Sequence, residues 1–114
     1  TAPWRNSLVD YKFKEDVVFK KLQMYVDKTY EQHYGSGKIQ STEFIFDSGH
    51  GEGFCIGNII KYAQRYGKKN DSKNDMDLYK VIHYALILLG EREKEREELD
   101  KYYTSQYDNG NNNG

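Results

Sequence analysis

The sequence predicts a mainly α-helical protein: a small single-domain bundle of about four helices, with a charged C-terminal helix and a disordered tail. Three observations predict this fold. Apolar residues recur at three- and four-residue intervals along several segments, as they do on the buried face of a helix. The only proline, Pro3, precedes these segments and interrupts none of them. Only residues 39–49 have a strand-like composition, and a strand without a partner is not stable.

The periodic segments and the glycines between them set the expected order of elements. Helices are expected over three periodic ranges and over the charged residues that follow Gly90: 10–30, 54–67, 76–89 and 91–103. Residues 39–49 are predicted as a short helix or an extended connector. Residues 49–53 are predicted as a flexible link, which lacks the lysine and serine of a phosphate-binding P-loop. The predicted domain spans residues 1–104, and the Asn/Gly-rich residues 105–114 are expected to be disordered.

Charge is abundant but balanced, with 17 Lys and Arg against 18 Asp and Glu and a formal net charge of −1. Proteins that coat nucleic acid or bind membrane surfaces usually carry a global positive excess. The near-neutral balance therefore argues against extended duplex binding and against a membrane partner. Any site for an anion must be a local cluster of cations.

Several further features indicate the compartment and the assembly state. No apolar run approaches the roughly 20 residues of a membrane span, and the first residues show no signal-peptide pattern. The only cysteine, Cys55, excludes an internal disulfide, which suits a reducing cytoplasm. The eleven tyrosines suit half-buried faces, subunit contacts and base stacking. Together with the charged last helix, they predict a homo-oligomer.

The segment "GNIIKYAQRYGKK" (57–69) concentrates the cations of the chain. On a helical wheel its polar residues fall in one stripe: Asn58, Lys61, Arg65, Lys68 and Lys69. The apolar residues opposite are expected to face the core: Ile56, Ile59, Ile60 and Ala63. Neither Lys61 nor Arg65 has an acid three or four residues away, so the cations repel one another unless an anion neutralises them. The stripe is either an ordinary solvent face or a phosphate-binding surface.

The next helix has a matching polar face. Asp77, Lys80 and Tyr84 share one side by their spacing, and His83 lies beside them. Asp77 and Lys80 either pair with each other or, if the helices form an antiparallel hairpin, lie beside the basic stripe. In the second case Asp77 would orient Lys61 or Arg65, or act as a base toward a substrate hydroxyl.

Three segments together resemble a known family: "QHY" (32–34), "GFCIGNIIKYAQRYGKK" (53–69) and "DLYKVIHYALILL" (77–89). They resemble a small domain family encoded by tailed bacteriophages, with the central pattern Gly-Asn-x-x-Lys-Tyr-x-x-Arg-x-Gly-Lys-Lys. The resemblance covers about residues 30–90. A phage nucleotide kinase that phosphorylates deoxynucleoside monophosphates carries this domain, without a P-loop. The resemblance therefore implies a mononucleotide substrate, a nucleoside triphosphate as phosphate donor, accompanying Mg²⁺, and the cytoplasm of the infected host.

Within that resemblance, residue types suggest roles. The cations are expected to hold phosphates: Lys61, Arg65, Lys68, Lys69 and Lys80. Asn58 would orient the ligand by hydrogen bonds, and Tyr62 or Tyr84 would stack on a base. His33, and as a second choice His83, is the candidate acid/base, because an imidazole titrates near neutral pH.

Two other functions fit some of the residues. One is a non-catalytic phage protein whose basic stripe binds nucleotide, nucleic acid or a host protein. The other is an all-α, Mg²⁺-dependent nucleotide pyrophosphatase-like hydrolase, for which the candidate carboxylates are Glu43, Asp47, Glu52 and Asp77. His50 and Cys55 do not complete the four-ligand pattern of a zinc site, and we predict no metal ligands.

Overall fold

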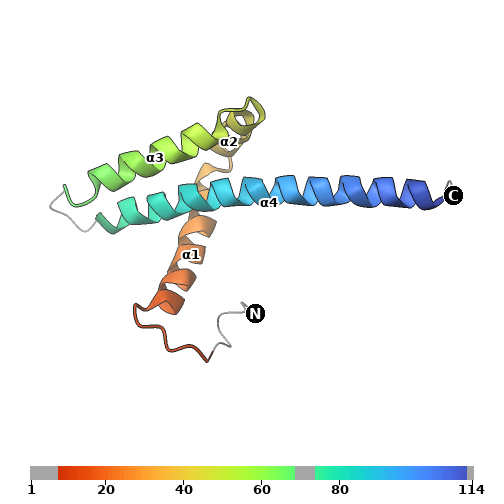
Figure 1. Cartoon of the computed structure of the whole chain (residues 1–114). Helices are drawn as coiled ribbons and strands as arrows, with labels where there is room; N and C mark the ends of the chain where they lie inside the picture. Colours follow the sequence, from red (N-terminus) through yellow and green to blue (C-terminus); the bar gives the residue numbers. More distant parts are fainter. Residues whose placement is uncertain (1–7, 69–73, 113–114) are drawn as a thin grey trace. The chain divides into compact units, whose positions relative to one another are not determined.

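The computed structural model describes residues 8–68 and 74–112, with side chains to residue 108. The described residues form four α-helices and no strand (Figure 1): α1 (Glu15–His33), α2 (Lys38–Asp47), α3 (Gly51–Arg65) and α4 (Asn74–Asn112). This confirms the predicted mainly α-helical fold. The chain divides into two units, Thr1–Ser48 with α1 and α2, and Gly49–Gly114 with α3 and α4.

The first unit decides between the helix and the connector predicted for residues 39–49, and it shows where the first helix begins. The strand-like residues form the helix α2, which ends as the backbone N–H of Ser48 donates to the carbonyls of Phe44 and Phe46. The helix α1 begins at Glu15, five residues later than predicted, after Lys14 in a left-handed conformation with φ 58°. The Glu15 carboxylate accepts a hydrogen bond from the backbone N–H of Phe13 at 2.8 Å, which stabilises this start.

The glycine-rich link is shorter than predicted. Gly49 has a positive φ of 89°, a conformation that glycine adopts without strain, and the chain re-enters a helix at Gly51. The prediction of a flexible link over 49–53 is therefore wrong for Gly51 and Gly53, which belong to the first turn of α3. Gly51 is buried, so the absence of a side chain there lets this turn of α3 pack closely.

Gly90 does not end a helix, contrary to the sequence prediction. The helix α4 is continuous over 39 residues, because a glycine inside a helix costs only about 1 kcal/mol relative to alanine. The residues predicted as a disordered tail are likewise helical from 105 to Asn112. Residues 113–114 lie outside the described part of the chain.

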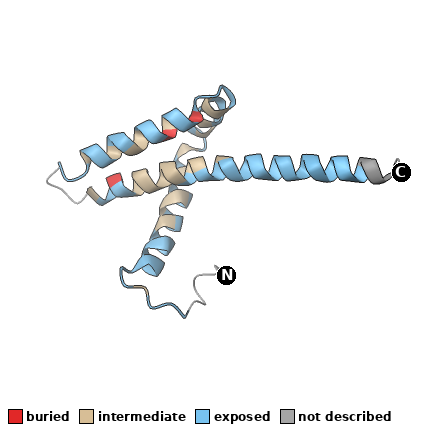
Figure 2. Ribbon diagram, in the orientation of Figure 1, coloured by how far each residue is buried: buried red, intermediate tan, exposed pale blue. Residues whose placement is uncertain are grey.

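The helices α3 and α4 form an antiparallel hairpin. Glu52, in the first turn of α3, pairs with Arg92 of α4 at 3.2 Å, while Arg65, in its last turn, lies 3.5 Å from Asp77 in the first turn of α4. Both helices are seen side by side in Figure 1. The buried residues of the described chain all belong to this hairpin: Gly51, Cys55 and Asp77 (Figure 2).

The side of α3 that contacts α4 is the opposite of the one expected. Cys55 is completely buried and Tyr62 and Arg65 are half-buried, whereas Ile56 and Ile60 are 43% and 62% exposed. Ala63 is exposed as well. The prediction that these residues face the core is therefore wrong for Ile56, Ile60 and Ala63, whereas Ile59 is half-buried. Phe54, Tyr62 and Arg65 face α4 instead. Tyr84 of α4 contacts the rings of Phe54 and Tyr62, and Asp77 of α4 pairs with Arg65.

Candidate functional site

Aromatic side chains contribute to the contact between α3 and α4. The rings of Tyr62 and Tyr84 stack with centroids 6.0 Å apart and an interplanar angle of 12°. Phe54 meets the edge of Tyr84 at 5.7 Å and 78°. Such pairs contribute about 0.5–1.5 kcal/mol beyond the area they bury. The stack fixes the position of Tyr62 between the two helices.

Three cations surround the ring of Tyr62. Measured to the ring centroid, the Nζ atoms of Lys61 and Lys80 lie at 4.6 and 4.9 Å, and the Cζ atom of Arg65 lies at 5.7 Å. We call these three cations with Tyr62 the basic cluster. Each cation–π contact stabilises by about 0.5–1 kcal/mol at an exposed site, while mutual repulsion of the cations opposes it. An anion bound here would relieve that repulsion.

Asp77 holds Arg65 within this cluster. Its side chain is 2% exposed, and its Oδ1 atom lies 3.5 Å from Nε of Arg65, a group that is 40% exposed. Asp77 also lies in the first turn of α4, where the helix dipole stabilises a negative charge. The structure thus places Asp77 beside Arg65 and not as a surface partner of the cluster.

The Asp77–Arg65 pair is incompletely hydrogen-bonded. The separation satisfies an ion pair, but within the described residues neither Nε of Arg65 nor Oδ2 of Asp77 has a hydrogen-bond partner. A buried polar atom without a partner is costly. Oδ2 of Asp77 is therefore a buried acceptor that the described side chains leave unused.

The remaining residues of the predicted site are distributed as follows. Asn58 is half-buried and its Nδ2 donates to the carbonyl of Phe54 at 2.9 Å, so its amide is engaged within α3. Lys68 is exposed, just after α3 and beyond Gly67, whose φ is 79°. Lys69 lies outside the described residues. His33 ends α1, which belongs to the other unit.

The two candidate stacking residues stack on each other. One face of Tyr62 and one face of Tyr84 are used in this way, which leaves a base only the outer side of Tyr62, where Lys61 and Lys80 lie. Burial, followed by the proximity of Tyr62 and Cys55, raises the pKa of Tyr84 above its usual value of 10.0. Its hydroxyl therefore stays protonated at neutral pH and can donate a hydrogen bond.

Phe54 and Cys55 belong to the hairpin core but were not singled out as core residues by the sequence pattern. Burial and, secondarily, the charge of Glu91 raise the pKa of the Cys55 thiol above 9.0, so it is an inert packing group. The signal that could have found these residues is their spacing. Cys55 precedes Asn58, Tyr62 and Arg65 by three, seven and ten residues, the repeat of one helix face.

The candidate acids of a metal-dependent hydrolase come from three helices. Glu52 pairs with Arg92 and Asp77 with Arg65, while Glu43 and Asp47 belong to α2 in the other unit. In the described part of the chain, no group of three or more His, Cys, Asp or Glu could hold a metal ion. Within the same residues, no helix is both long and apolar enough to cross a membrane.

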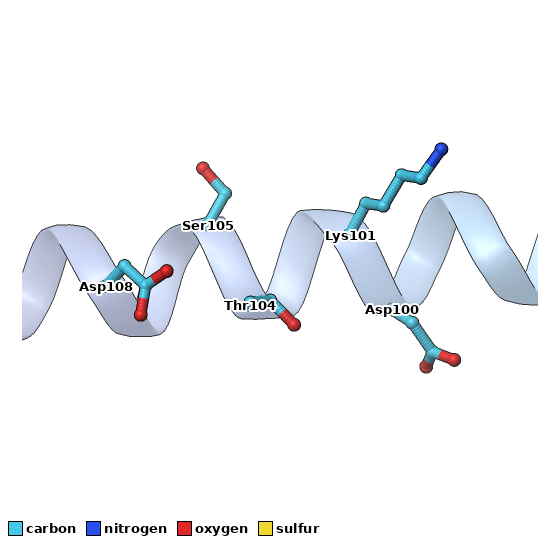
Figure 3. Close-up of a pocket in the computed structure, with 5 residues that line it drawn as sticks. All are labelled: Asp100, Lys101, Thr104, Ser105 and Asp108. Atoms are coloured by element: carbon cyan, nitrogen blue, oxygen red, sulfur yellow. The ribbon is translucent and has the colours of Figure 1, made fainter.

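A shallow surface depression on α4 lies away from the basic cluster. It is lined by Asp100, Lys101, Thr104, Ser105 and Asp108 (Figure 3). All five come from successive turns of one helix, and Figure 3 shows Lys101 and Asp100 extending to opposite sides of it. The nearest lining residue is 16 residues beyond Tyr84, roughly 25 Å along the axis. This depression has neither the enclosure nor the convergent polar groups of a ligand site.

Comparison with known proteins identifies the family. Residues 28–86, which are 59 of the 114 residues, match the family described as protein of unknown function (DUF3310). No curated protein and no solved structure matches the chain. The matched range contains the whole basic cluster and Asp77, and it ends shortly after Tyr84. Since more than half of the chain matches, the protein belongs to the DUF3310 family.

Proposed function

We propose that this DUF3310 protein binds a mononucleotide by its phosphate group, on the side of the α3–α4 hairpin that carries the basic cluster. The observation that supports this most directly is the gathering of Lys61, Arg65 and Lys80 around one tyrosine ring, from two different helices. Cations from two elements around an aromatic surface suit a ligand that has both a phosphate and a flat base.

The size of the cluster favours a mononucleotide over a polymer. The three cations share one ring of α3 and α4, and the chain as a whole carries a net charge of −1. Long nucleic acids are bound by extended positive surfaces that contact many phosphates. A compact group of three cations matches one or two phosphate groups, and Lys68 adds a fourth cation close in sequence to Arg65.

The activity proposed for this site is phosphoryl transfer between nucleotides in the cytoplasm of a phage-infected host, as the resemblance to the phage nucleotide kinase implies. An oxygen of the bound monophosphate would attack the γ-phosphorus of a nucleoside triphosphate, forming a diphosphate and releasing a second one. The protein would contribute position and positive charge, which are the main requirements of this reaction. Mg²⁺ would arrive with the triphosphate.

The residue roles follow from the geometry of the cluster. Lys61 and Lys80 are proposed to contact phosphate oxygens, because their Nζ atoms lie on the same ring from opposite helices. Asp77 is proposed as a positioning residue for Arg65, since it is 2% exposed and pairs with that guanidinium. The acid/base role of His33 stays a prediction. The homo-oligomer predicted from the tyrosines and the charged last helix also stays a prediction.

A specific observation favours the non-catalytic alternative, in which the protein binds nucleotide without transfer. The cluster gathers three cations, which match one or two phosphate groups. Transfer has to hold the four phosphates of a monophosphate and a triphosphate at the same time. Binding and transfer therefore have to be measured separately.

The deciding experiment combines titration and turnover. Each deoxynucleoside monophosphate and its unphosphorylated nucleoside is titrated calorimetrically, and γ-labelled triphosphate is then added with Mg²⁺ and with chelator. Lys61→Ala and Lys80→Ala should each weaken monophosphate binding at least about tenfold, since a charge-assisted contact contributes about 1.5–3 kcal/mol. Label in the diphosphate product would support the kinase, and binding without label would support the non-catalytic protein.

The matched control is Lys101→Ala, which removes an exposed lysine from the same helix as Lys80 but far from the cluster. It should bind monophosphates like the unchanged protein. Equal weakening by Lys80→Ala and Lys101→Ala would contradict the proposed site. Equal affinity for the nucleoside and the monophosphate would contradict phosphate recognition itself.

A further inference from the structure

The α3–α4 hairpin has a second side, which is apolar. Relative to the residues of α3 that face α4, such as Cys55 and Tyr62, the isoleucines lie on one flank of the helix and Lys61 on the other. In α4, relative to Asp77 and Tyr84, the leucines lie on one flank and Lys80 on the other. In each helix, turning about the axis in the direction in which the chain winds leads from the residues that face the other helix to the apolar flank.

Because the two helices are antiparallel, equal rotations in them lead to the same side of the pair. The apolar flanks of α3 and α4 therefore adjoin, just as Lys61 and Lys80 adjoin at the Tyr62 ring on the other side. We define the apolar side as the following residues: Ile56, Ile59, Ile60 and Ala63 of α3, with Leu78, Ile82, Leu86 and Leu89 of α4.

The apolar side is uncovered within the hairpin. The exposed fractions are 43% for Ile56, 62% for Ile60, 42% for Leu78, 41% for Leu86 and 60% for Leu89. Cys55 is the only apolar side chain that is buried among the described residues. A two-helix hairpin with so small a core is not stable alone, because helices in proteins are held mainly by the packing of an apolar face.

We propose that the apolar side is the contact surface between two copies of this chain, which pair through it as a two-fold symmetric four-helix bundle. The eight residues that define the surface carry no ionisable side chain, and the Glu52–Arg92 ion pair lies at one end of the same side. A highly charged partner such as a nucleic acid therefore finds little to bind on it. A copy of the same surface is a chemically matched partner. A two-fold axis brings identical patches together, and two antiparallel hairpins packed in this way form a four-helix bundle.

The available area is consistent with this pairing. A fully exposed Ile or Leu side chain offers on the order of 100 Å² of apolar surface, so the five half-exposed residues offer about 250–300 Å². The partly exposed Ile59, Ile82 and neighbouring alanines increase this sum. One partner of a standard interface contributes about 800 Å², of which roughly 450 Å² is apolar. Monomeric proteins rarely expose a contiguous apolar patch larger than a few hundred Å², and the apolar side reaches that size.

The pairing leaves the basic cluster open. Since Lys61 and Lys80 lie on the side of the hairpin opposite the isoleucines, both copies would present their clusters to solvent. The inference therefore does not depend on the proposed nucleotide site, and each can fail without the other.

The test is sedimentation of the full chain over a range of concentrations, for the unchanged protein and for Ile60→Glu. The unchanged protein should form dimers, and Ile60→Glu should raise the dimer dissociation constant at least about a hundredfold, because the symmetric interface buries the new charge twice. Met24→Glu is the matched control, since Met24 of α1 has the same exposed fraction of 62%; it should leave the dimer intact. Monophosphate titration of Ile60→Glu should give the affinity of the unchanged protein.

A cross-linking measurement covers the case in which Ile60→Glu loses its helical circular dichroism. Ile60→Cys keeps a small apolar side chain and should form a covalent dimer with a short bis-maleimide. The unchanged protein should not, because its only thiol, that of Cys55, is buried. A monomer at every concentration, a dimer that survives Ile60→Glu, or no cross-linked Ile60→Cys dimer would each overturn the proposal.

Discussion

The first half of α4, residues 74–91, and its second half, residues 92–108, belong to one helix but are held by different interactions. The first half packs on α3 through Asp77 and Tyr84, and most of its residues are at least partly buried. In the second half every described side chain is exposed. Ion pairs three residues apart, Glu91–Lys94 and Glu93–Arg96, support the helix as it leaves α3.

The difference teaches where to look for function in this chain. A helix supported by its own ion pairs tolerates substitution, because each such pair contributes only a few tenths of a kcal/mol. A helix that depends on tertiary contacts requires particular residues. The family match ends at residue 86, inside the half of α4 that packs on α3. The matched residues 28–86 therefore include the α3–α4 contact with its basic cluster, whereas the charged second half of α4 lies outside the match.

The largest effect is expected from Arg65→Ala. This change leaves the 2%-exposed carboxylate of Asp77 without its cation, and removing one partner of a buried pair costs about 3–5 kcal/mol. Because Arg65 itself is 40% exposed, we expect the lower end, about 3 kcal/mol, in urea unfolding. Asp77→Asn should cost less, about 1 kcal/mol, since Arg65 can turn toward water. A larger loss for Asp77→Asn than for Arg65→Ala would contradict the assigned burial.

Alkaline pH should lower the free energy of unfolding of the α3–α4 hairpin. The loss is about 1 kcal/mol for each unit by which folding raises the pKa of a buried group. The pKa values of Cys55 and Tyr84 are raised in the folded state above 9.0 and 10.0. The folded chain then holds protons that the unfolded chain releases, so stability is full below pH 9 and falls above it. Urea midpoints at pH 8 and 10 measure this. Cys55→Ala with Tyr84→Phe should flatten the dependence, and an unchanged slope would contradict it.

Gly90→Ala should stabilise the protein by about 0.5–1 kcal/mol. Gly90 lies inside α4, near the junction of its two halves, and a Cβ placed there meets no atom within 4 Å. The gain should appear as a higher urea midpoint and increased helical circular dichroism. Gly67→Ala is the contrasting variant, since its φ of 79° strains a non-glycine residue, and it should destabilise. A loss of stability in Gly90→Ala would show that α4 bends or is contacted at this point.

The smallest effect is expected from Arg96→Ala in the second half of α4. It removes an exposed pair with Glu93, which contributes about 0.3–0.5 kcal/mol. The loss should shrink further in 1 M salt, where charges more than about 3 Å apart are screened. Thermal unfolding at low and high salt measures both quantities. A loss above 1 kcal/mol that persists in salt would mean that Arg96 has a tertiary partner.

The composition and periodicity of the chain were sufficient to predict the helical class and the approximate places of three helices. They were not sufficient for the ends of helices next to glycines. Gly51 and Gly90 were interpreted as breaks, yet both lie inside helices. Glycine weakens a helix by an amount that packing can exceed, and local sequence does not reveal that Gly51 is buried.

The residues of the candidate site were all visible in the sequence: Lys61 and Arg65 stand out as cations without neighbouring acids, and Asp77, Lys80 and Tyr84 share one helix face by their spacing. The sequence by itself determined the mainly α-helical class, the concentration of Lys61, Arg65 and Lys80 on two helix faces, and the membership of the DUF3310 family. Only the tertiary structure decided which face of α3 is inside. A helical wheel assigns the isoleucines to the core by hydrophobicity alone. The face that is buried also depends on the side chains of the helix that packs against it. Here Asp77 of α4 pairs with Arg65, and Tyr84 of α4 stacks on Tyr62. Ile56 and Ile60 stay exposed.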